Sequence, residues 1–173
     1  MTLGRLASEE RYKGFDEVIE ALPELARKIP NISYLICGDG PDRARLEEKA
    51  RSLGVHDRVV FAGFITEARK VDYYRLADAY IMPSRGEGFG IVLLEALACG
   101  LPAMGSTVDG SREALLEGAL GELVDPANAG QVVTGIMNTL ARRKGVPDRL
   151  QEYATSAFHK RASGIVSEVL ACR

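Results

Sequence analysis

Apolar residues follow two alternating patterns along this chain. Short runs of apolar residues rich in β-forming types alternate with longer segments in which apolar residues recur every three or four positions. This alternation is typical of a parallel sheet covered by helices, because strands buried on both faces are continuously apolar and surface helices are amphipathic. The expected strands are residues 34–37, 58–62, 79–82, 102–105 and 122–124.

The segments between these runs predict helices. Residues 15–28 place five apolar side chains on one face, and residues 43–53 begin after Pro41 and Asp42, a good start signal. Further helices are expected at 68–76 and 91–99, with a short one from Ser111, whose hydroxyl is expected to cap it, although a role in a ligand site is the alternative. From residue 126 to 173 the pattern is mainly helical, with breaks expected near 145–147 and 159–164.

The length of the chain favours one domain. With 173 residues, 46% of them hydrophobic, it can form one sizeable core and is short for two. We therefore expect residues 1–173 to form a single α/β domain with a doubly wound, Rossmann-like parallel sheet. Only Met1, Thr2 and Leu3 precede Gly4 and Arg5, whereas a buried strand usually needs about five residues. This suggests a domain taken from a longer protein, with a naturally short first strand as the alternative.

Composition excludes several classes of partner. The formal net charge is −2, so neither nucleic acid nor an anionic membrane is an expected partner. Cys37, Cys99 and Cys172 are scattered and expected to be reduced and structural. With two histidines and no CxxC, HExxH or D-x-D motif, no metal site is expected. No apolar run suits a membrane span, and no signal peptide is recognisable, so a cytoplasmic location is expected.

The strongest chemical signal is the glycine-rich segment that follows the strand at 79–82. Residues 83–90, PSRGEGFG, lead directly into the helix that starts at Ile91. Small residues let a ligand approach the backbone, and a helix N-terminus offers unpaired N–H groups and positive dipole, which suit a phosphate. Glu87 and Glu95 flank this turn, and carboxylates there suit sugar or ribose hydroxyls. The expected ligand is a nucleoside diphosphate sugar.

These residues carry a resemblance to a known family. Glu87 and Glu95, within EGFGIVLLEALACGLP, resemble the signature of retaining GT-B glycosyltransferases of the GT4 type, the glycosyl transferases group 1. The resemblance extends through residues 4–13, 38–40 and 59–63, and weakens after about Asp125. It implies the C-terminal, donor-binding domain of a two-domain enzyme. The missing N-terminal domain would bind the acceptor. A peripheral contact with a membrane through that domain is also open.

The resemblance also implies roles for individual residues. Glu87 would bind hydroxyls of the transferred sugar and Glu95 the ribose diol of the nucleotide. The backbone that would meet the sugar and the diphosphate belongs to Gly88, Phe89, Gly90 and Ile91. Arg5 and Lys13, on either side of one strand-to-helix loop, would grip the diphosphate, and with Glu87 they are the expected catalytic residues. Fixed cations of this kind can stabilise a leaving diphosphate without a metal. The alternative for both is an ordinary surface cation.

Two further segments are expected near the nucleotide. Gly38-Asp39-Gly40-Pro41 lacks the third glycine of a dinucleotide fingerprint, and no P-loop motif exists, so redox and P-loop functions are disfavoured. The resemblance places Gly38 and Gly40 near the nucleotide and gives contacts with the base to Phe64 and Ile65. For Phe64, packing against the next helix is an equal alternative.

The expected function is therefore transfer of a hexosyl group from a UDP-, GDP- or ADP-sugar to an acceptor, with retention of configuration and without a further cofactor. The alternatives are a non-catalytic nucleotide-sugar-binding module and a nucleotide-sugar epimerase. An epimerase would need a titratable proton shuttle, for which His56 and His159 show no suitable setting.

Overall fold

Six short parallel strands form the centre of the protein in the computed structural model, which describes residues 1–171. They are β1 (Thr2–Leu3), β2 (Tyr34–Cys37), β3 (Val59–Gly63), β4 (Tyr80–Ile81), β5 (Ala103–Ser106) and β6 (Glu122–Val124). Five of them coincide with the predicted strands to within one residue at each end, and β1 is the expected short first strand.

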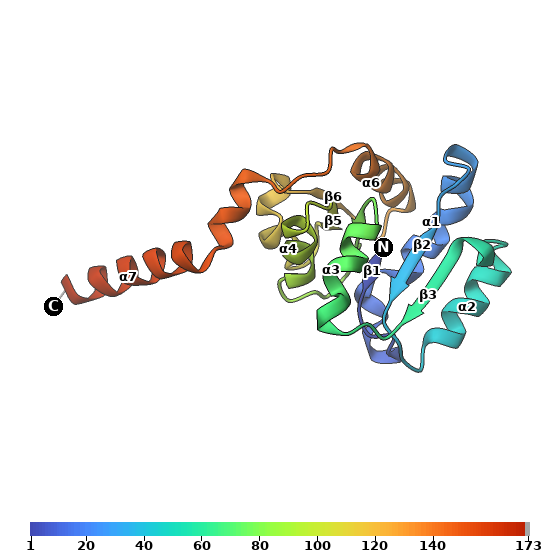
Figure 1. Ribbon diagram of the computed structural model, residues 1–173, viewed down its shortest axis with the longest axis horizontal. Helices are drawn as coiled ribbons and strands as arrows, with labels where there is room; N and C mark the ends of the chain where they lie inside the picture. Colours follow the sequence, from blue (N-terminus) through green and yellow to red (C-terminus); the bar gives the residue numbers. More distant parts are fainter. Residues whose placement is uncertain (172–173) are drawn as a thin grey trace.

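The strands form two three-stranded parallel sheets that meet edge to edge. One has the order β1-β2-β3 and the other β4-β5-β6. The N–H of Ile81 in β4 donates to the carbonyl of Met1 at 2.9 Å, and the hydroxyl of Thr2 donates to the carbonyl of Ile81 at 2.5 Å. The strands therefore follow one another as 3-2-1-4-5-6, the order of a doubly wound fold (Figure 1).

Helices cover both faces of this sheet. Their bounds are α1 (Phe15–Lys28), α2 (Arg43–Ser52), α3 (Glu67–Leu76), α4 (Ile91–Ala98), α5 (Ser111–Ala114) and α6 (Ala129–Ala141). Short 3₁₀ turns are η1 (Ser8–Lys13), η2 (His56–Arg58), η3 (Leu116–Gly118) and η4 (Asp148–Tyr153). The core on one face contains side chains of α1, α2 and α6, and the core on the other contains those of α3, α4 and α5.

Alternation along the strands divides the apolar residues between the two cores. Ile36 of β2 and Ile81 of β4 lie in the first core, whereas their neighbours Cys37 and Tyr80 lie in the second. This is the two-residue period of a strand whose faces are both buried. Burial raises the pKa of the Cys37 thiol to about 11, so Cys37 is an inert core residue. Cys99 is also a free thiol, and Cys172 lies outside the described residues.

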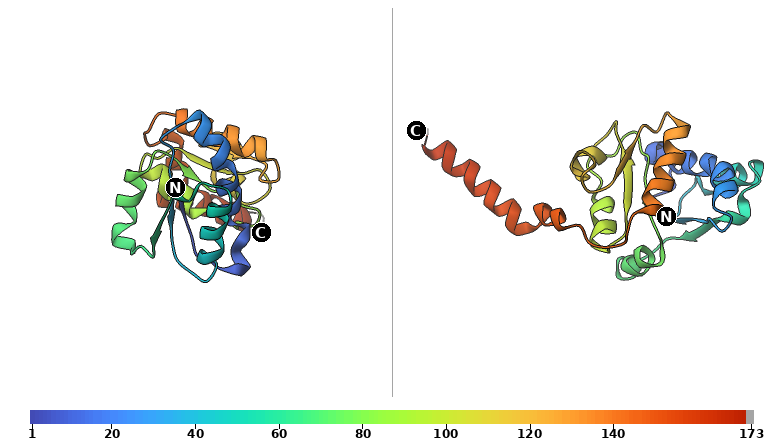
Figure 2. Two further views of the ribbon diagram at one scale, coloured as in Figure 1. Left: turned by 90° about the vertical axis from the view of Figure 1, so that its right-hand side faces the viewer. Right: turned by 90° about the horizontal axis from the view of Figure 1, so that it is seen from above.

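Beyond α6 the chain leaves the body of the domain. The last helix, α7 (Thr155–Ala171), follows η4 and extends away from the sheet, as the right-hand view of Figure 2 shows. The predicted break near 145–147 is present, but the break predicted near 159–164 is wrong, because α7 continues through it. A single Gly164 in an exposed helix costs only about 1 kcal/mol relative to alanine, which does not interrupt a helix. Among residues 1–171, no helix has the length and apolarity that a membrane span requires.

The start of α5 differs from the prediction. The hydroxyl of Ser111 does not cap this helix, since Ser111 is its first helical residue and its Oγ is buried with no hydrogen-bond partner in the described chain. The N–H of Ser111 instead donates to the Asp109 carboxylate at 3.0 Å. The carboxylate of Asp109, two residues earlier in the chain, therefore caps the start of α5 in place of the Ser111 hydroxyl.

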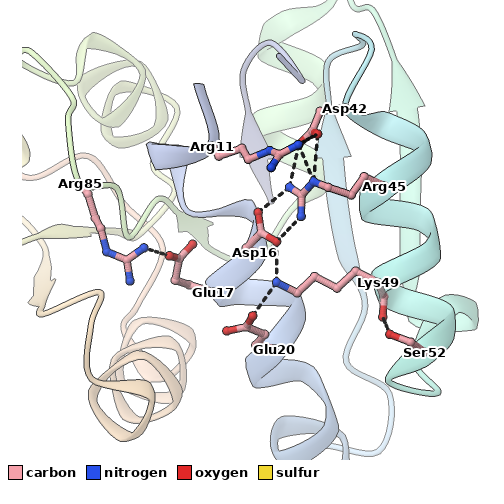
Figure 3. A network of polar contacts seen from close by, with 9 residues as sticks. All are labelled: Arg11, Asp16, Glu17, Glu20, Asp42, Arg45, Lys49, Ser52 and Arg85. Atoms are coloured by element: carbon pink, nitrogen blue, oxygen red, sulfur yellow. Dashed lines mark hydrogen bonds and ion pairs between the residues drawn. The ribbon is translucent and has the colours of Figure 1, made fainter. Parts of the chain in front are cut away.

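An ion-pair network joins α1 to α2 and to η1 (Figure 3). Asp16 accepts from Arg45 at 2.7 Å and from Lys49 at 2.5 Å, and Asp42 accepts from Arg45 at 2.7 Å and from Arg11 at 3.0 Å. Burial raises the pKa of Asp16, but the hydrogen bonds from Arg45 and Lys49 outweigh it and lower the pKa overall. The hydrogen bond from Arg45 is the main cause of the lowered pKa of Asp42.

We expect this network to stabilise the protein above about pH 4, the unfolded pKa of an aspartate, and to lose its effect as pH falls through the lower folded values. Asp16→Asn should cost about 1.5–3 kcal/mol of unfolding free energy at pH 7, the range for hydrogen bonds to charged groups. The difference from wild type should shrink below pH 4, as measured by urea unfolding. Glu20→Gln, which alters a half-exposed partner of Lys49, is the control and should cost less than about 1 kcal/mol. A pH-independent Asp16→Asn effect would contradict the assignment.

Candidate functional site

A cavity of about 290 Å³ opens where the carboxyl ends of β1, β2 and β4 meet. This is the point at which the strand order reverses, where open α/β sheets generally bind ligands. Six predicted site residues line it, namely Arg5, Lys13, Gly38, Phe64, Ile65 and Glu87. A larger hollow of about 450 Å³, lined mostly by apolar side chains of α1, β2 and α6, contains none of them. Its only charged residue is Asp78, so the convergent polar groups favour the smaller cavity as the site.

Close backbone packing holds three loops together around this cavity. A Cβ on Gly14 would lie 2.6 Å from the carbonyl oxygen of Pro83, and one on Gly110 would lie 2.2 Å from that of Gly88. The N–H of Arg85 donates to the carbonyl of Tyr12 at 2.8 Å. The loops after β1, β4 and β5 therefore support one another, which brings residues far apart in sequence to one edge of the sheet.

Asp109, which the sequence did not reveal, anchors the glycine-rich loop. One of its oxygens accepts from the Ser84 hydroxyl at 2.5 Å and from the Glu87 N–H at 2.9 Å. The carbonyl of Glu87 in turn accepts from the Gly110 N–H at 2.9 Å. Both backbone groups of Glu87 are thus fixed from the β5–α5 loop. On the other side, Arg85 pairs with Glu17 of α1 (Figure 3).

The glycine-rich loop ends at Gly90, which is the residue before α4 and has a left-handed φ of 93°. The N–H groups of Gly88, Phe89 and Gly90 have no hydrogen-bond partner among the described residues. Together with the first N–H groups of α4, starting at Ile91, they form a positive edge that can bind an anion. Binding of a phosphate by these N–H groups stays a prediction.

The two predicted cations lie together and share one carboxylate. Arg5 and Lys13 both pair with Glu10, with 2.7 Å between the Lys13 ammonium and the Glu10 carboxylate. Arg5 is 79% exposed, whereas Lys13 is largely covered because Gly4 leaves room for its stem. The Glu10 side chain is itself 11% exposed, and its hydrogen bond with Lys13 lowers its pKa, so it is an anion at neutral pH. The site holds two cations and, between them, an internal negative charge.

The two predicted glutamates differ in their surroundings. Glu87 lines the cavity, whereas Glu95 lies in the second turn of α4 and binds two residues of α3. Its carboxylate accepts from Lys70 at 3.1 Å and from the Tyr74 hydroxyl at 2.8 Å. Lys70 and Tyr74 were not predicted from the sequence. Their i, i+4 spacing on one helix face was the available signal, because it presents a donor pair to a neighbouring element.

Among the remaining predicted residues, some line the cavity and others do not. Phe64 is 80% exposed, so packing against α3 does not explain it, and it stands beside Ile65 in the cavity wall. Gly38 and Gly40 have a role in packing. A Cβ on Gly38 would lie 1.8 Å from the carbonyl oxygen of Gly4, and a Cβ on Gly40 would lie 2.3 Å from that of Leu6. Gly38 also lines the cavity, whereas Gly40 does not. No cluster of three or more metal-ligating side chains occurs within residues 1–171.

Comparison with known proteins identifies the family. Residues 2–157 match the model for glycosyl transferases group 1, which is most of the chain. The chain belongs to this family. Its sequence is 38% identical, over 136 residues, to the GDP-mannose-dependent α-(1-6)-phosphatidylinositol monomannoside mannosyltransferase of Mycolicibacterium smegmatis. The matched region covers 75% of this chain and 36% of that protein.

Several solved structures share the fold of this chain. Sucrose-phosphate synthase from Thermosynechococcus elongatus superimposes with a TM-score of 0.76 and 25% identity, covering 99% of this chain and 46% of that one. HepE from Anabaena, described in complex with UDP and glucose, gives a TM-score of 0.74 at 21% identity over 96% of this chain and 48% of that one. The family and the Rossmann-like α/β fold predicted from the sequence are confirmed. The chain spans less than half the length of these relatives.

Proposed function

We propose that this group 1 glycosyltransferase chain is a donor domain that binds a nucleoside diphosphate hexose for transfer to an acceptor with retention of configuration. The observation that carries the proposal is that two cations and Glu87 line one cavity, which the first turn of α4 borders through Val92 and to which Glu95 is joined through Lys70. Cations and free N–H groups suit a diphosphate, and carboxylates suit the hydroxyls on either side of it. Residues 1–173 would act with an acceptor-binding domain elsewhere in the protein.

The roles of the side chains follow from their places around the cavity. Glu87, fixed through its backbone by Asp109, would bind hydroxyls of the sugar, and Glu95 would bind the ribose. Lys13 and Arg5 would stabilise the charge that grows on the departing diphosphate, as preorganised cations do in a site without a metal. Phe64 and Ile65, at the same rim, would contact the base. GDP is the first nucleotide to test, because the mannosyltransferase relative is named as GDP-mannose-dependent.

Thermal unfolding of this chain with GDP, UDP and ADP tests the proposal. At about 100 times its Kd, the correct nucleotide should stabilise the fold by about 2.7 kcal/mol, a rise of roughly 5–10 °C in Tm. Glu95→Ala should remove most of that rise, because it removes the proposed ribose contact. Glu24→Ala, a change at an exposed ion pair of α1, is the matched control and should keep it. Absence of any shift with all three nucleotides at millimolar concentration would refute the donor site.

A further inference from the structure

The carboxylate of Glu95 has both oxygens bound by α3, each by a different donor. Lys70 donates to one oxygen at 3.1 Å and the Tyr74 hydroxyl donates to the other at 2.8 Å. A carboxylate has about four lone-pair sites, two on each oxygen. One site on each oxygen is therefore used, and one on each is left for a ligand. Two acceptors held side by side match two neighbouring hydroxyl groups.

Both donors are held firmly. Tyr74 is 1% exposed and packs against the ring of Tyr80, with 5.7 Å between the ring centroids. Burial and the Glu95 carboxylate raise the pKa of the Tyr74 hydroxyl, so its proton remains available for the hydrogen bond. The Lys70 side chain is only 15% exposed and also pairs with Glu67 at 2.9 Å. Burial opposes the charge of Lys70, but its hydrogen bonds with Glu67 and Glu95 raise its pKa overall, so it stays cationic.

Lys70 also connects Glu95 to the cavity. Lys70 and Glu67 line the cavity together with Phe64 and Glu87, whereas Tyr74 lies beneath, in the core between α3 and α4. The pair thus approaches Glu95 from the cavity wall and from the core. Without them, a glutamate side chain on a helix would be free to rotate, and its hydrogen bonds to a ligand would cost more conformational entropy.

We propose that Lys70 and Tyr74 are positioning residues that fix the Glu95 carboxylate for the two ribose hydroxyls of the nucleotide. They set the preference for ribonucleotides over deoxyribonucleotides. The inference rests on the proposed donor site, because it assigns residues that support one of its contacts. It predicts an effect confined to the ribose, since Lys70 and Tyr74 bind the carboxylate of Glu95, whereas Arg5 and Lys13 pair with Glu10.

Calorimetric titration of this chain with the best-binding nucleoside diphosphate, and with its 2′-deoxy and 3′-deoxy analogues, tests this. Wild type should bind the ribonucleotide at least about tenfold more tightly than either analogue, because each analogue lacks a hydroxyl group that would donate to the charged Glu95 carboxylate. In Tyr74→Phe and in Lys70→Met, ribonucleotide affinity should fall about tenfold while affinity for the analogues stays nearly unchanged. The ratio of the two affinities should therefore approach one. Lys70→Met keeps the apolar stem and removes only the charge.

Tyr73→Phe is the matched control, because it removes a hydroxyl from the neighbouring position of α3 that does not contact Glu95. It should preserve the wild-type ratio, and unfolding of each variant without ligand establishes that it is folded. Equal losses for ribo- and deoxynucleotides in Tyr74→Phe and Lys70→Met would show a merely structural role and overturn the inference. Wild-type binding without ribose discrimination would also overturn it and leave the donor site standing. No binding of any nucleoside diphosphate would refute the donor site itself.

Discussion

Replacing Lys13 by alanine should lower the affinity of this chain for its nucleoside diphosphate by about 10- to 100-fold, while affinity for the monophosphate changes little. The Lys13 ammonium is largely shielded from water and lies 2.7 Å from the carboxylate of Glu10. The attraction between this shielded cation and a phosphate is screened much less than that of a surface cation. Removing Lys13 should therefore have a large effect on diphosphate binding. Without Lys13, Glu10 also remains in the anion site with only the exposed Arg5 to balance it.

In the proposed two-domain transferase, the same change should lower turnover by about 10²–10³, the usual cost of removing one group that stabilises transition-state charge. Arg5→Ala should have a smaller effect on binding, because Arg5 is 79% exposed and water can replace it. Glu10→Gln should strengthen diphosphate binding a few-fold, since the ligand no longer displaces an internal anion. Calorimetry at two salt concentrations measures all three variants. Equal losses for mono- and diphosphate in Lys13→Ala would place Lys13 away from the second phosphate.

The alternation of strands and helices was predictable because both faces of the sheet are buried. Residues 34–37 are continuously apolar, and they divide between the two cores as the alternation of a strand requires, with Ile36 on one side and Cys37 on the other. The amphipathic face of residues 15–28 likewise predicts α1 to the residue. Local pattern determines these elements, so the sequence alone was sufficient for them.

The residues that support the site were not predictable in the same way. Asp109 lies 22 residues after Glu87, and Lys70 and Tyr74 lie 25 and 21 residues before Glu95. Nothing local distinguishes them from a loop acid, a surface lysine and a core tyrosine. Their partners depend on how the β4–α4 segment packs between the β5–α5 loop and α3. The wrong assignment of the Ser111 cap has the same origin, because α5 starts at Ser111 itself and the N–H of Ser111 donates to the carboxylate of Asp109.

Gly38→Ala should be among the most destabilising single changes in this chain, at about 2–5 kcal/mol, from overpacking together with a left-handed φ. Gly38 has a φ of 143°, and a Cβ there would lie 1.8 Å from the carbonyl oxygen of Gly4. That contact is with backbone, which cannot rotate away. Gly38 also donates to the carbonyl of Gly63 at 2.8 Å, so any movement would pull on the ends of β1, β2 and β3 together.

Gly63→Ala is the matched control for Gly38→Ala. Gly63 has a left-handed φ of 71°, but a Cβ there would meet nothing within 4 Å, so its substitution adds backbone strain of about 1–2 kcal/mol without a clash. Urea unfolding of both variants separates the two costs, and equal costs would show that the Gly4 contact relaxes. Because Gly38 lines the cavity, a movement that relieves the clash would also displace the loops that carry Arg5 and Lys13. Gly38→Ala protein that does fold should therefore bind the diphosphate more weakly than Gly63→Ala, which makes this glycine a link between the packing of the sheet and the proposed donor site.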